Sequence, residues 1–298
     1  MTIRYFVTGA SGLLGKFLVP HLVECGYGVV CLENSHKLEF ENQAVLKVGC
    51  DLVQRKEIES LLCEISPDVI IHAAGITNVD QCERDPQKAK LLNTEIPSWL
   101  SQWSENHGKQ YVFISSDHVT AGVKPFFTEE DPVSAVNVYA QTKIEAEKEI
   151  LHYAHTAKII RTNFFGKGPF WRKSLTDWLW EKAIAGEIIS AFTDSYFSPL
   201  SARYLSKAIV DLSVLPVKGI FHVGGSERVS KHEFALKFFA AFDMDVDIVR
   251  PSLVGDSNLI APRPMDMSMA VTKIENTLGY KMPDLQESFD SIRVDYRP

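Results

Sequence analysis

The sequence lacks the features that mark several large protein classes. Among its 298 residues no apolar run approaches the roughly 20 residues that a membrane-spanning helix needs. The 5 cysteines are an odd number without a C-x-x-C pair, so neither a disulfide framework nor a metal site is expected. Lys and Arg (31) are fewer than Asp and Glu (38), so the net charge of −7 offers no basic surface to nucleic acid or anionic lipid. We therefore expect a cytoplasmic protein with neither nucleic acid nor a membrane as partner.

What the sequence does contain is a glycine-rich turn near its start. Ile3 to Thr8 is a β-branched and aromatic run, long enough for one buried strand. Gly9, Gly12 and Gly15 follow directly, and Lys16 to Glu24 then carries apolar residues at helical spacing. Strand, glycine turn and helix are the context of a dinucleotide-binding fingerprint. Gly9 would permit the tight turn, Gly12 would let the backbone approach a pyrophosphate, and Gly15 would let the helix pack closely on the strand.

An acidic residue ends the next predicted strand. Val29 to Leu32 is a second buried run, and Glu33 follows it. A carboxylate about 20 residues past the glycines usually holds the ribose of the adenosine half. Because Glu33 would accept both ribose hydroxyls and repel a 2′-phosphate, NAD(H) is favoured as cofactor, with NADP(H) as the alternative.

Short apolar runs and amphipathic segments alternate through the first half of the chain. Strands are predicted at 45–48, 67–75 and 110–116, with a helix from about 86 to 106 that contains Asn93. Small residues at the end of the 67–75 run, Ala73 and Ala74, would let the nicotinamide half of a cofactor cross. The alternation predicts an α/β fold with a Rossmann-type, doubly wound parallel sheet.

The pattern loosens after residue 160. We expect a loop at 166–172, helices at 175–185 and 234–242, a strand at 219–223 and a loop-rich tail. The predicted organisation is a dinucleotide-binding domain over 1–163, to which the chain returns around 195–225. A smaller substrate-binding lobe would comprise 164–194 and 226–298.

The candidate catalytic pair is Tyr139 and Lys143, four residues apart on a predicted helix and so on one face. With 9 tyrosines in the chain, chance also produces such pairs, but here Ser115 and Ser116 end the preceding strand. A cation about 4 Å from a phenol is worth about 4 kcal/mol at an effective dielectric of about 20. We therefore expect Lys143 to bring the pKa of Tyr139 down from about 10 towards the working pH.

Together these motifs resemble the extended short-chain dehydrogenase/reductases. The matching pieces are Thr8 to Gly15, Glu33-Asn34, Asp51-Leu52, His72 to Ala74, Asn93, Ser115-Ser116, Tyr139 with Lys143, and Arg161-Thr162. Within that family the sequence looks most like the dTDP-4-dehydrorhamnose reductase branch. That likeness rests on Thr77 to Asp80, Cys82-Glu83, Asp85-Pro86, Ser116-Asp117, Asn137 to Tyr139, Ser198-Pro199 and Arg263-Pro264.

The resemblance implies a reductase of a nucleotide-linked 4-keto-6-deoxysugar. It assigns Tyr139 as proton donor, Lys143 as its partner and Ser116 as the hydroxyl that orients the substrate. The implied cofactor residues are Gly9, Ser11, Gly12, Leu13, Gly15, Glu33, Asp51, Leu52, Ala73, Ala74, Asn93 and Lys143. The implied substrate residues are His118, Asn163 and Arg263, with Arg263 near the nucleotide diphosphate.

Departures from that branch fall on the sugar side of the site. His118 follows Ser116-Asp117 where the branch usually has tyrosine, and Asn163-Phe164 stands where it often has Ser-Trp. His118 is either a general acid or a hydrogen-bonded loop residue. The Trp171, Trp178 and Trp180 group is expected to pack rather than to bind a ligand.

Two other functions fit the same residues. One is an NAD-dependent nucleotide-sugar 4-epimerase, which needs the same three residues, Ser116, Tyr139 and Lys143. The other is a non-catalytic regulatory subunit, because the methionine adenosyltransferase β subunits resemble the same branch. A 4,6-dehydratase is not expected, since those relatives carry Asp-Glu where this chain has Asp117-His118. The oligomeric state is left open, a homodimer included.

Overall fold

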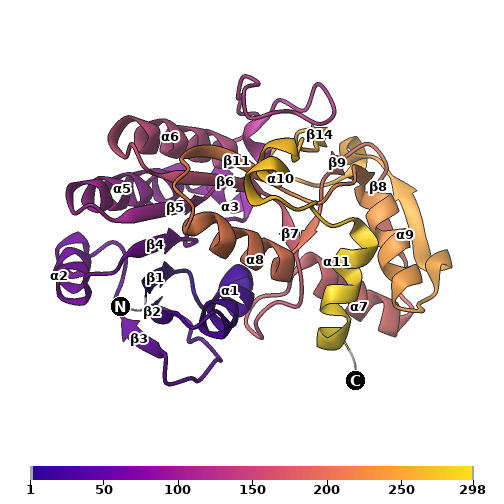
Figure 1. Cartoon of the computed structure of the whole chain (residues 1–298). Helices are drawn as coiled ribbons and strands as arrows, with labels where there is room; N and C mark the ends of the chain where they lie inside the picture. Colours follow the sequence, from indigo (N-terminus) through magenta and orange to yellow (C-terminus); the bar gives the residue numbers. More distant parts are fainter. Residues whose placement is uncertain (1–2, 297–298) are drawn as a thin grey trace.

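The computed structural model describes residues 3–296 (Figure 1), so the outermost ends of the two predicted domains lie outside the described residues. A seven-stranded sheet with the order β11-β6-β5-β4-β1-β2-β3 forms the centre. Every neighbouring pair in it is parallel. The strands are β1 (Arg4–Thr8), β2 (Gly28–Glu33), β3 (Val45–Gly49), β4 (Val69–His72), β5 (Gln110–Ile114), β6 (Lys158–Thr162) and β11 (Gly219–Val223).

Helices cover both faces of the sheet, which explains why its strands are largely apolar. One face packs against α1 (Leu13–Glu24), α8 (Ala202–Ser213) and α10 (Thr272–Leu278). The opposite face packs against α2 (Arg55–Ile65), α5 (Ile96–Asn106) and α6 (Val138–Tyr153). This is the predicted Rossmann-type α/β fold.

The helix predicted at 86–106 has an irregular middle. It begins as α4 (Pro86–Lys90), widens into a π-helical turn, η1 (Leu91–Glu95), and continues as α5. Asn93 lies in the π turn, where its side chain is buried. A shorter helix, α3 (Val79–Arg84), precedes this segment and begins at the side-chain cap of Asn78.

The second half of the chain builds a smaller lobe beside the sheet, on the right in Figure 1. Its helices are α7 (Leu175–Ala185), α9 (Lys231–Ala241) and α11 (Leu285–Ile292). Its short strands are β7 (Phe164–Phe165), β8 (Ile189–Phe192), β9 (Tyr196–Phe197), β10 (Leu200–Ser201), β12 (Val229–Ser230), β13 (Val249–Ser252) and β14 (Asp266–Met267). An aromatic core holds the lobe together, with Phe165, Phe234, Phe238 and Phe289 at its centre.

Several elements differ from the sequence-based expectation. Strand β6 was not predicted, because Lys158 and Arg161 interrupt its apolar run; both are buried here and hydrogen-bonded. The tail expected to be loop-rich contains α10 and α11. The predicted helix 175–185 is confirmed, and so is the cap that Ser230 and Glu233 form for α9.

Candidate active site

A cavity of about 500 Å³ opens at the carboxyl ends of the central strands. Its wall is made by the segments that follow β1, β4, β5 and β6, together with the start of α6 and the segment before α7. Ligands of open parallel sheets bind at this edge. Twelve of the residues expected in the site line it: Gly9, Ser11, Gly12, Leu13, Ala73, Ala74, Asn93, Ser116, His118, Tyr139, Lys143 and Asn163.

The glycine turn forms the cavity floor and needs its glycines for steric reasons. Gly9 has a φ of +72°, and a Cβ there would lie 2.8 Å from the backbone of Ala73. A Cβ on Gly15 would lie 2.1 Å from the carbonyl oxygen of Ala10. Gly15 therefore serves backbone packing and does not line the cavity. The turn leads directly into α1, whose first residue is Leu13, so the helix N-terminus faces the cavity.

Tyr139 enters the cavity from the first turn of α6. The helix begins there because the Asn137 side chain accepts a hydrogen bond from the Ala140 N–H at 2.8 Å, and Glu83 accepts one from the Val138 N–H at 2.7 Å. Burial raises the pKa of Tyr139 to about 12, although the Ser116 hydroxyl beside it opposes the shift. The phenol is therefore neutral and carries its proton at pH 7.

The expected lowering of the Tyr139 pKa by Lys143 is wrong for this structure. The Lys143 ammonium donates to the carbonyl of Ile114 at 2.7 Å and lies 4.2 Å from the centre of the Phe113 ring. Burial lowers the pKa of Lys143 to about 7, with the Glu147 carboxylate opposing the shift. The phenol and the ammonium line one cavity, but burial dominates the charge state of both.

A polar cluster surrounds Ser116 at the end of β5. The Ser116 hydroxyl donates to Asp117 at 3.2 Å, and Asn163 donates to the other Asp117 oxygen at 2.7 Å. Burial raises the pKa of Asp117 to about 6, against the field of Lys231. These bonds tie the ends of β5 and β6 together, so Ser116 and Asn163 face the cavity from adjacent strands.

His118 lies edge-on to Tyr139, with ring centres 5.6 Å apart. Burial, with Lys231 and Arg263 nearby, lowers the pKa of His118 to about 3, so the ring is neutral at pH 7. Its Nδ1 is buried and has no hydrogen-bond partner among residues 3–296. A neutral ring with an open nitrogen is suited to hydrogen bonding rather than to acting as a cationic acid.

Asn93 links the segment after β4 to helix α6 by side-chain hydrogen bonds. Its carbonyl accepts from the Ile76 N–H at 2.8 Å, while its amide donates to the Ile76 carbonyl at 3.0 Å and to the Thr142 hydroxyl at 3.2 Å. The π turn brings this side chain under the segment that follows β4. Asn93 thus links the Ala73-Ala74 wall of the cavity to the helix that carries Tyr139.

Besides Gly15, three expected cofactor residues lie outside the cavity wall. Glu33 is buried, and its carboxylate accepts from the Leu38 N–H at 2.8 Å and pairs with Lys37 at 3.1 Å. Asp51 is exposed and accepts from the Val53 N–H, and Leu52 packs against the apolar core on the α2 face. Glu33 ends β2, and Asp51 and Leu52 follow β3, farther along the sheet edge than the cavity reaches.

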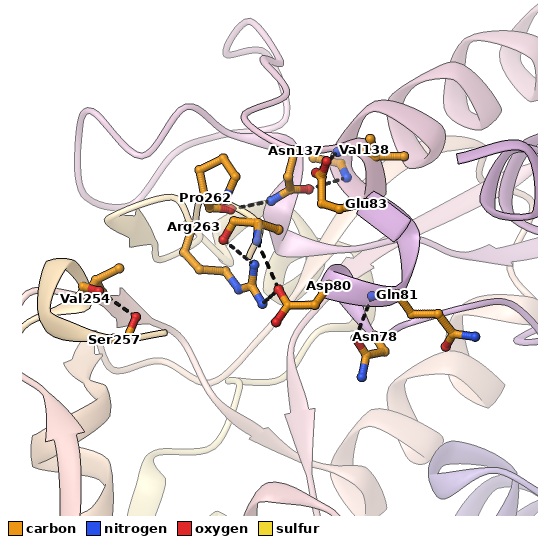
Figure 2. Close-up of polar contacts among 12 residues, drawn as sticks. Asn78, Asp80, Gln81, Glu83, Asn137, Val138, Val254, Ser257, Pro262 and Arg263 are labelled. Carbon is orange, nitrogen blue, oxygen red and sulfur yellow. Dashed lines mark hydrogen bonds and ion pairs between the residues drawn. The ribbon is translucent and has the colours of Figure 1, made fainter. Parts of the chain in front are cut away.

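Arg263 is also outside the cavity wall, and Figure 2 shows the polar contacts that it makes. Its guanidinium donates to Asp80 of α3 at 2.8 Å and to the Ala261 carbonyl at 2.7 Å. Next to it, the Asn137 amide donates to the Pro262 carbonyl at 2.9 Å. Arg263 therefore fastens a segment of the smaller lobe to α3, and Asn137 fastens the same segment to the start of α6.

The cavity wall includes residues that sequence reasoning did not assign to it. Trp171, Arg172 and Lys173 precede α7, and Thr77 lies opposite them after β4. Trp171 was expected to pack; its ring does pack, on His36, and it also lines the cavity. The available signal was two cations placed directly before a helix cap, Ser174, in an otherwise acidic chain.

Within the described part of the chain, no three His, Cys, Asp or Glu side chains come together as metal ligands. None of the helices described is long and apolar enough to cross a membrane.

Comparison with known proteins gives a consistent result. Residues 3–297 match the family described as the RmlD substrate binding domain. A solved hypothetical dTDP-4-dehydrorhamnose reductase from Sulfolobus tokodaii is 33% identical, with a TM-score of 0.84 over 97% of this chain and 98% of that one. The dTDP-4-dehydrorhamnose reductase of Bacillus anthracis, solved with NADP, is 25% identical, with a TM-score of 0.87 over 99% and 100%. The β subunit of rat methionine adenosyltransferase 2 is 27% identical over 99% of this chain and 89% of its own length.

The glycine turn, the strand-end serine and the Tyr139-Lys143 pair lie in one cavity, as the resemblance implied, and the family match spans nearly the whole chain. The protein belongs to the RmlD substrate binding domain family, in the dTDP-4-dehydrorhamnose reductase-like branch of the extended short-chain dehydrogenase/reductases.

Proposed function

We propose that the protein is an NAD(P)H-dependent reductase of a nucleotide-linked 4-keto-6-deoxysugar. The observation that carries the proposal is the meeting of Ser116, Tyr139 and Lys143 with the glycine turn on one cavity. The similarity to dTDP-4-dehydrorhamnose reductases supports the substrate class.

In the proposed mechanism, Tyr139 donates its proton to the oxygen of the sugar C4 carbonyl. With its pKa raised to about 12, the phenol is protonated at pH 7 and so carries the proton that the carbonyl oxygen receives. The Ser116 hydroxyl holds the same carbonyl oxygen. Lys143 holds the nicotinamide ribose. The bound nicotinamide supplies the hydride to C4.

The proposed cofactor-binding residues are those that the resemblance implied. Gly9, Ser11, Gly12 and Leu13 fit a pyrophosphate, because the Gly9 position leaves no room for a Cβ and the turn opens into the N-terminus of α1. We propose NAD(H) as the favoured cofactor because of the Glu33 carboxylate. Lys37, which pairs with Glu33, makes that preference small, since a cation beside the carboxylate favours a 2′-phosphate.

We also propose that the smaller lobe binds the substrate. It would comprise 164–194 and 226–298, against a dinucleotide-binding domain of 1–163 with the return around 195–225. Asn163 and the neutral His118 would bind sugar hydroxyls. Arg263 would contribute by holding its segment of the lobe against α3.

A regulatory subunit is the second candidate, because the rat β subunit matches 99% of the chain. The test is to incubate the purified protein with NADH or NADPH and a panel of nucleotide-linked 4-keto sugars, following absorbance of the reduced nicotinamide. Consumption of the reduced cofactor is expected. Sugar conversion without net consumption would identify an epimerase. Cofactor binding with no conversion of any sugar would favour the regulatory candidate.

A further inference from the structure

The segment 166–174 contributes Trp171 to Ser174 to the cavity wall, and its backbone is held from both sides. On the α1 side, the Lys16 ammonium donates to the Gly168 carbonyl at 3.0 Å. On the α7 side, Asp177 accepts the N–H groups of Gly168 and Ser174 at 2.8 and 2.9 Å. The side chains that follow Gly168 are therefore presented to the cavity by an ordered backbone.

Trp171 has an indole N–H that the protein leaves unused. Its ring stacks on His36, which follows β2, with centres 3.8 Å apart and planes 3° apart. The stack fixes the orientation of the indole. Its Nε1 is buried and has no hydrogen-bond partner within residues 3–296. Because a buried N–H without an acceptor is costly, a ligand oxygen in the adjoining cavity would remove that cost.

Arg172 and Lys173 are the exposed cations of the cavity wall, and Lys143 is the buried one. The Arg172 guanidinium donates to the Thr77 hydroxyl, an uncharged partner, and is close enough to Tyr139 to lower the pKa of the phenol. Arg263, by contrast, is neutralised by Asp80 outside the cavity wall. The chain as a whole has a net charge of −7. Arg172, whose partner Thr77 is uncharged, is therefore the guanidinium of the cavity wall that can bind an anionic ligand.

We propose that Trp171 and Arg172 form a second pyrophosphate-binding set, facing the first one in the glycine turn. The indole N–H donates one hydrogen bond to a phosphate oxygen, and the guanidinium exchanges Thr77 for the same diphosphate. The inference rests on the proposed function, which supplies two ligands of this chemistry. One is the diphosphate of the dinucleotide cofactor, and the other is the diphosphate of the nucleotide-linked sugar.

The test measures dissociation constants of NADH and of dTDP, separately, by titration calorimetry. Arg172→Gln removes the charge, and Trp171→Phe keeps an aromatic ring against His36 but removes the N–H. Lys182→Gln is the matched control, because Lys182 lies on α7, pairs with Glu187 and is outside the cavity wall. We expect Arg172→Gln to weaken one of the two ligands by about 10-fold or more and Trp171→Phe to weaken the same ligand by about 3- to 10-fold. The control should change neither by more than about 2-fold.

The two ligands distinguish the sources of the diphosphate. Weakened NADH alone assigns the set to the cofactor, and weakened dTDP alone assigns it to the sugar nucleotide. If the unmodified protein binds NADH and dTDP, and both variants bind them as the control does, the inference is overturned while the proposed function stands. If the unmodified protein binds neither NADH nor NADPH, that result contradicts the proposed function itself and not the inference alone.

Discussion

Burial, more than any single neighbour, sets the protonation of the residues at the centre of the cavity. The pKa of Tyr139 is raised to about 12 and that of Lys143 is lowered to about 7, and desolvation is the largest cause of both shifts. At pH 7 the resting site therefore contains a protonated phenol and a lysine that is about half protonated. A bound anionic dinucleotide would favour the charged form of that lysine, which couples cofactor binding to proton uptake.

Tyr139→Phe should lower turnover of the 4-keto sugar by about 10²–10⁴-fold, the usual worth of a positioned general acid. The ring and its packing remain, so the dissociation constant of NADH should stay within about 2-fold. Tyr153→Phe, at the exposed end of the same helix, is the control and should keep full activity. The comparison needs initial rates and a cofactor titration for each variant. Retained activity in Tyr139→Phe would remove the phenol from the mechanism.

NADH affinity should fall as pH rises above 7. The pKa of free Lys143 is about 7, and binding raises it, so the complex holds a proton that the free protein has lost above that pH. The slope should approach, but not exceed, about tenfold per pH unit, and should vanish below pH 7. Lys143→Met should bind NADH more weakly and flatten the profile between pH 7 and 8; an unchanged slope there would contradict the assignment.

Cofactor preference should depend on the pair formed by Glu33 and Lys37. Lys37→Ala leaves the buried carboxylate uncompensated, so it should raise the ratio of the NADPH to the NADH dissociation constant by about 3- to 10-fold. Glu33→Gln should lower the ratio by a similar factor. Glu39→Gln changes an exposed charge in the same loop and is the control. Tighter binding of NADPH than of NADH by the unmodified protein would refute the NAD(H) proposal.

Among the elements, α6 connects the cavity, through Tyr139, to the smaller lobe. Its first turn is capped by Asn137 and Glu83, and the amide of the same Asn137 holds Pro262 of the smaller lobe (Figure 2). The ion pair between Asp80 and Arg263 lies beside this contact. A movement of the 253–264 segment would therefore displace the first turn of α6, which carries Tyr139.

A double-mutant cycle distinguishes two roles for Arg263: a structural ion pair with Asp80, and direct contact with the ligand. If Arg263 acts through Asp80, then Asp80→Asn and Arg263→Gln should show a coupling of about 0.5–1 kcal/mol in the free energy of unfolding, as expected of a partly exposed pair. Urea denaturation measures it. In the Asp80→Asn background, Arg263→Gln should then change the dTDP affinity little. An equal loss of dTDP affinity from Arg263→Gln in both backgrounds would instead place the guanidinium on the ligand.

Elements with a strong local signal could be predicted from the sequence, and elements determined by tertiary contacts could not. The glycine turn and the cap of α9 follow from local rules of backbone and side-chain hydrogen bonding. The π turn at Leu91–Glu95 has no such local signature. Likewise, nothing in the sequence near Glu33 shows that the Leu38 N–H and Lys37 occupy its carboxylate. The place of Arg172 in the cavity wall also depends on the fold of the smaller lobe.

For the molecule as a whole, the prediction of one parallel sheet was right because alternation of apolar runs and helices is a global signal. Its edge toward β11 was harder to predict, because buried charges interrupt the pattern. Arg161 of β6 and Glu147 of α6 form a buried ion pair at 2.7 Å, with each side chain 3% exposed. Glu147 also accepts from the Ser115 hydroxyl at 2.5 Å. These partners lie on separate elements, and only the folded chain brings them together.

Arg161→Met should lower the free energy of unfolding by about 3–5 kcal/mol, because it leaves the Glu147 carboxylate buried without its counter-charge. Lys281→Met is the matched control. Lys281 pairs with Glu275 but is 87% exposed, so less than about 1 kcal/mol should be lost. Urea unfolding of both variants provides the comparison. A loss for Arg161→Met as small as that of the control would show that the pair contributes little to stability.

The late position of β11 in the chain has a consequence for biosynthesis. Strand β6 leaves the ribosome well before its outer neighbour, since β7 to α8 must be translated between them. Until then β6 has an open edge, and the Lys158 ammonium lacks the Ser213 carbonyl that it contacts in the finished fold. The nascent chain therefore carries an exposed, apolar strand edge while the smaller lobe begins to emerge, which is the interval in which aggregation or chaperone capture competes with folding.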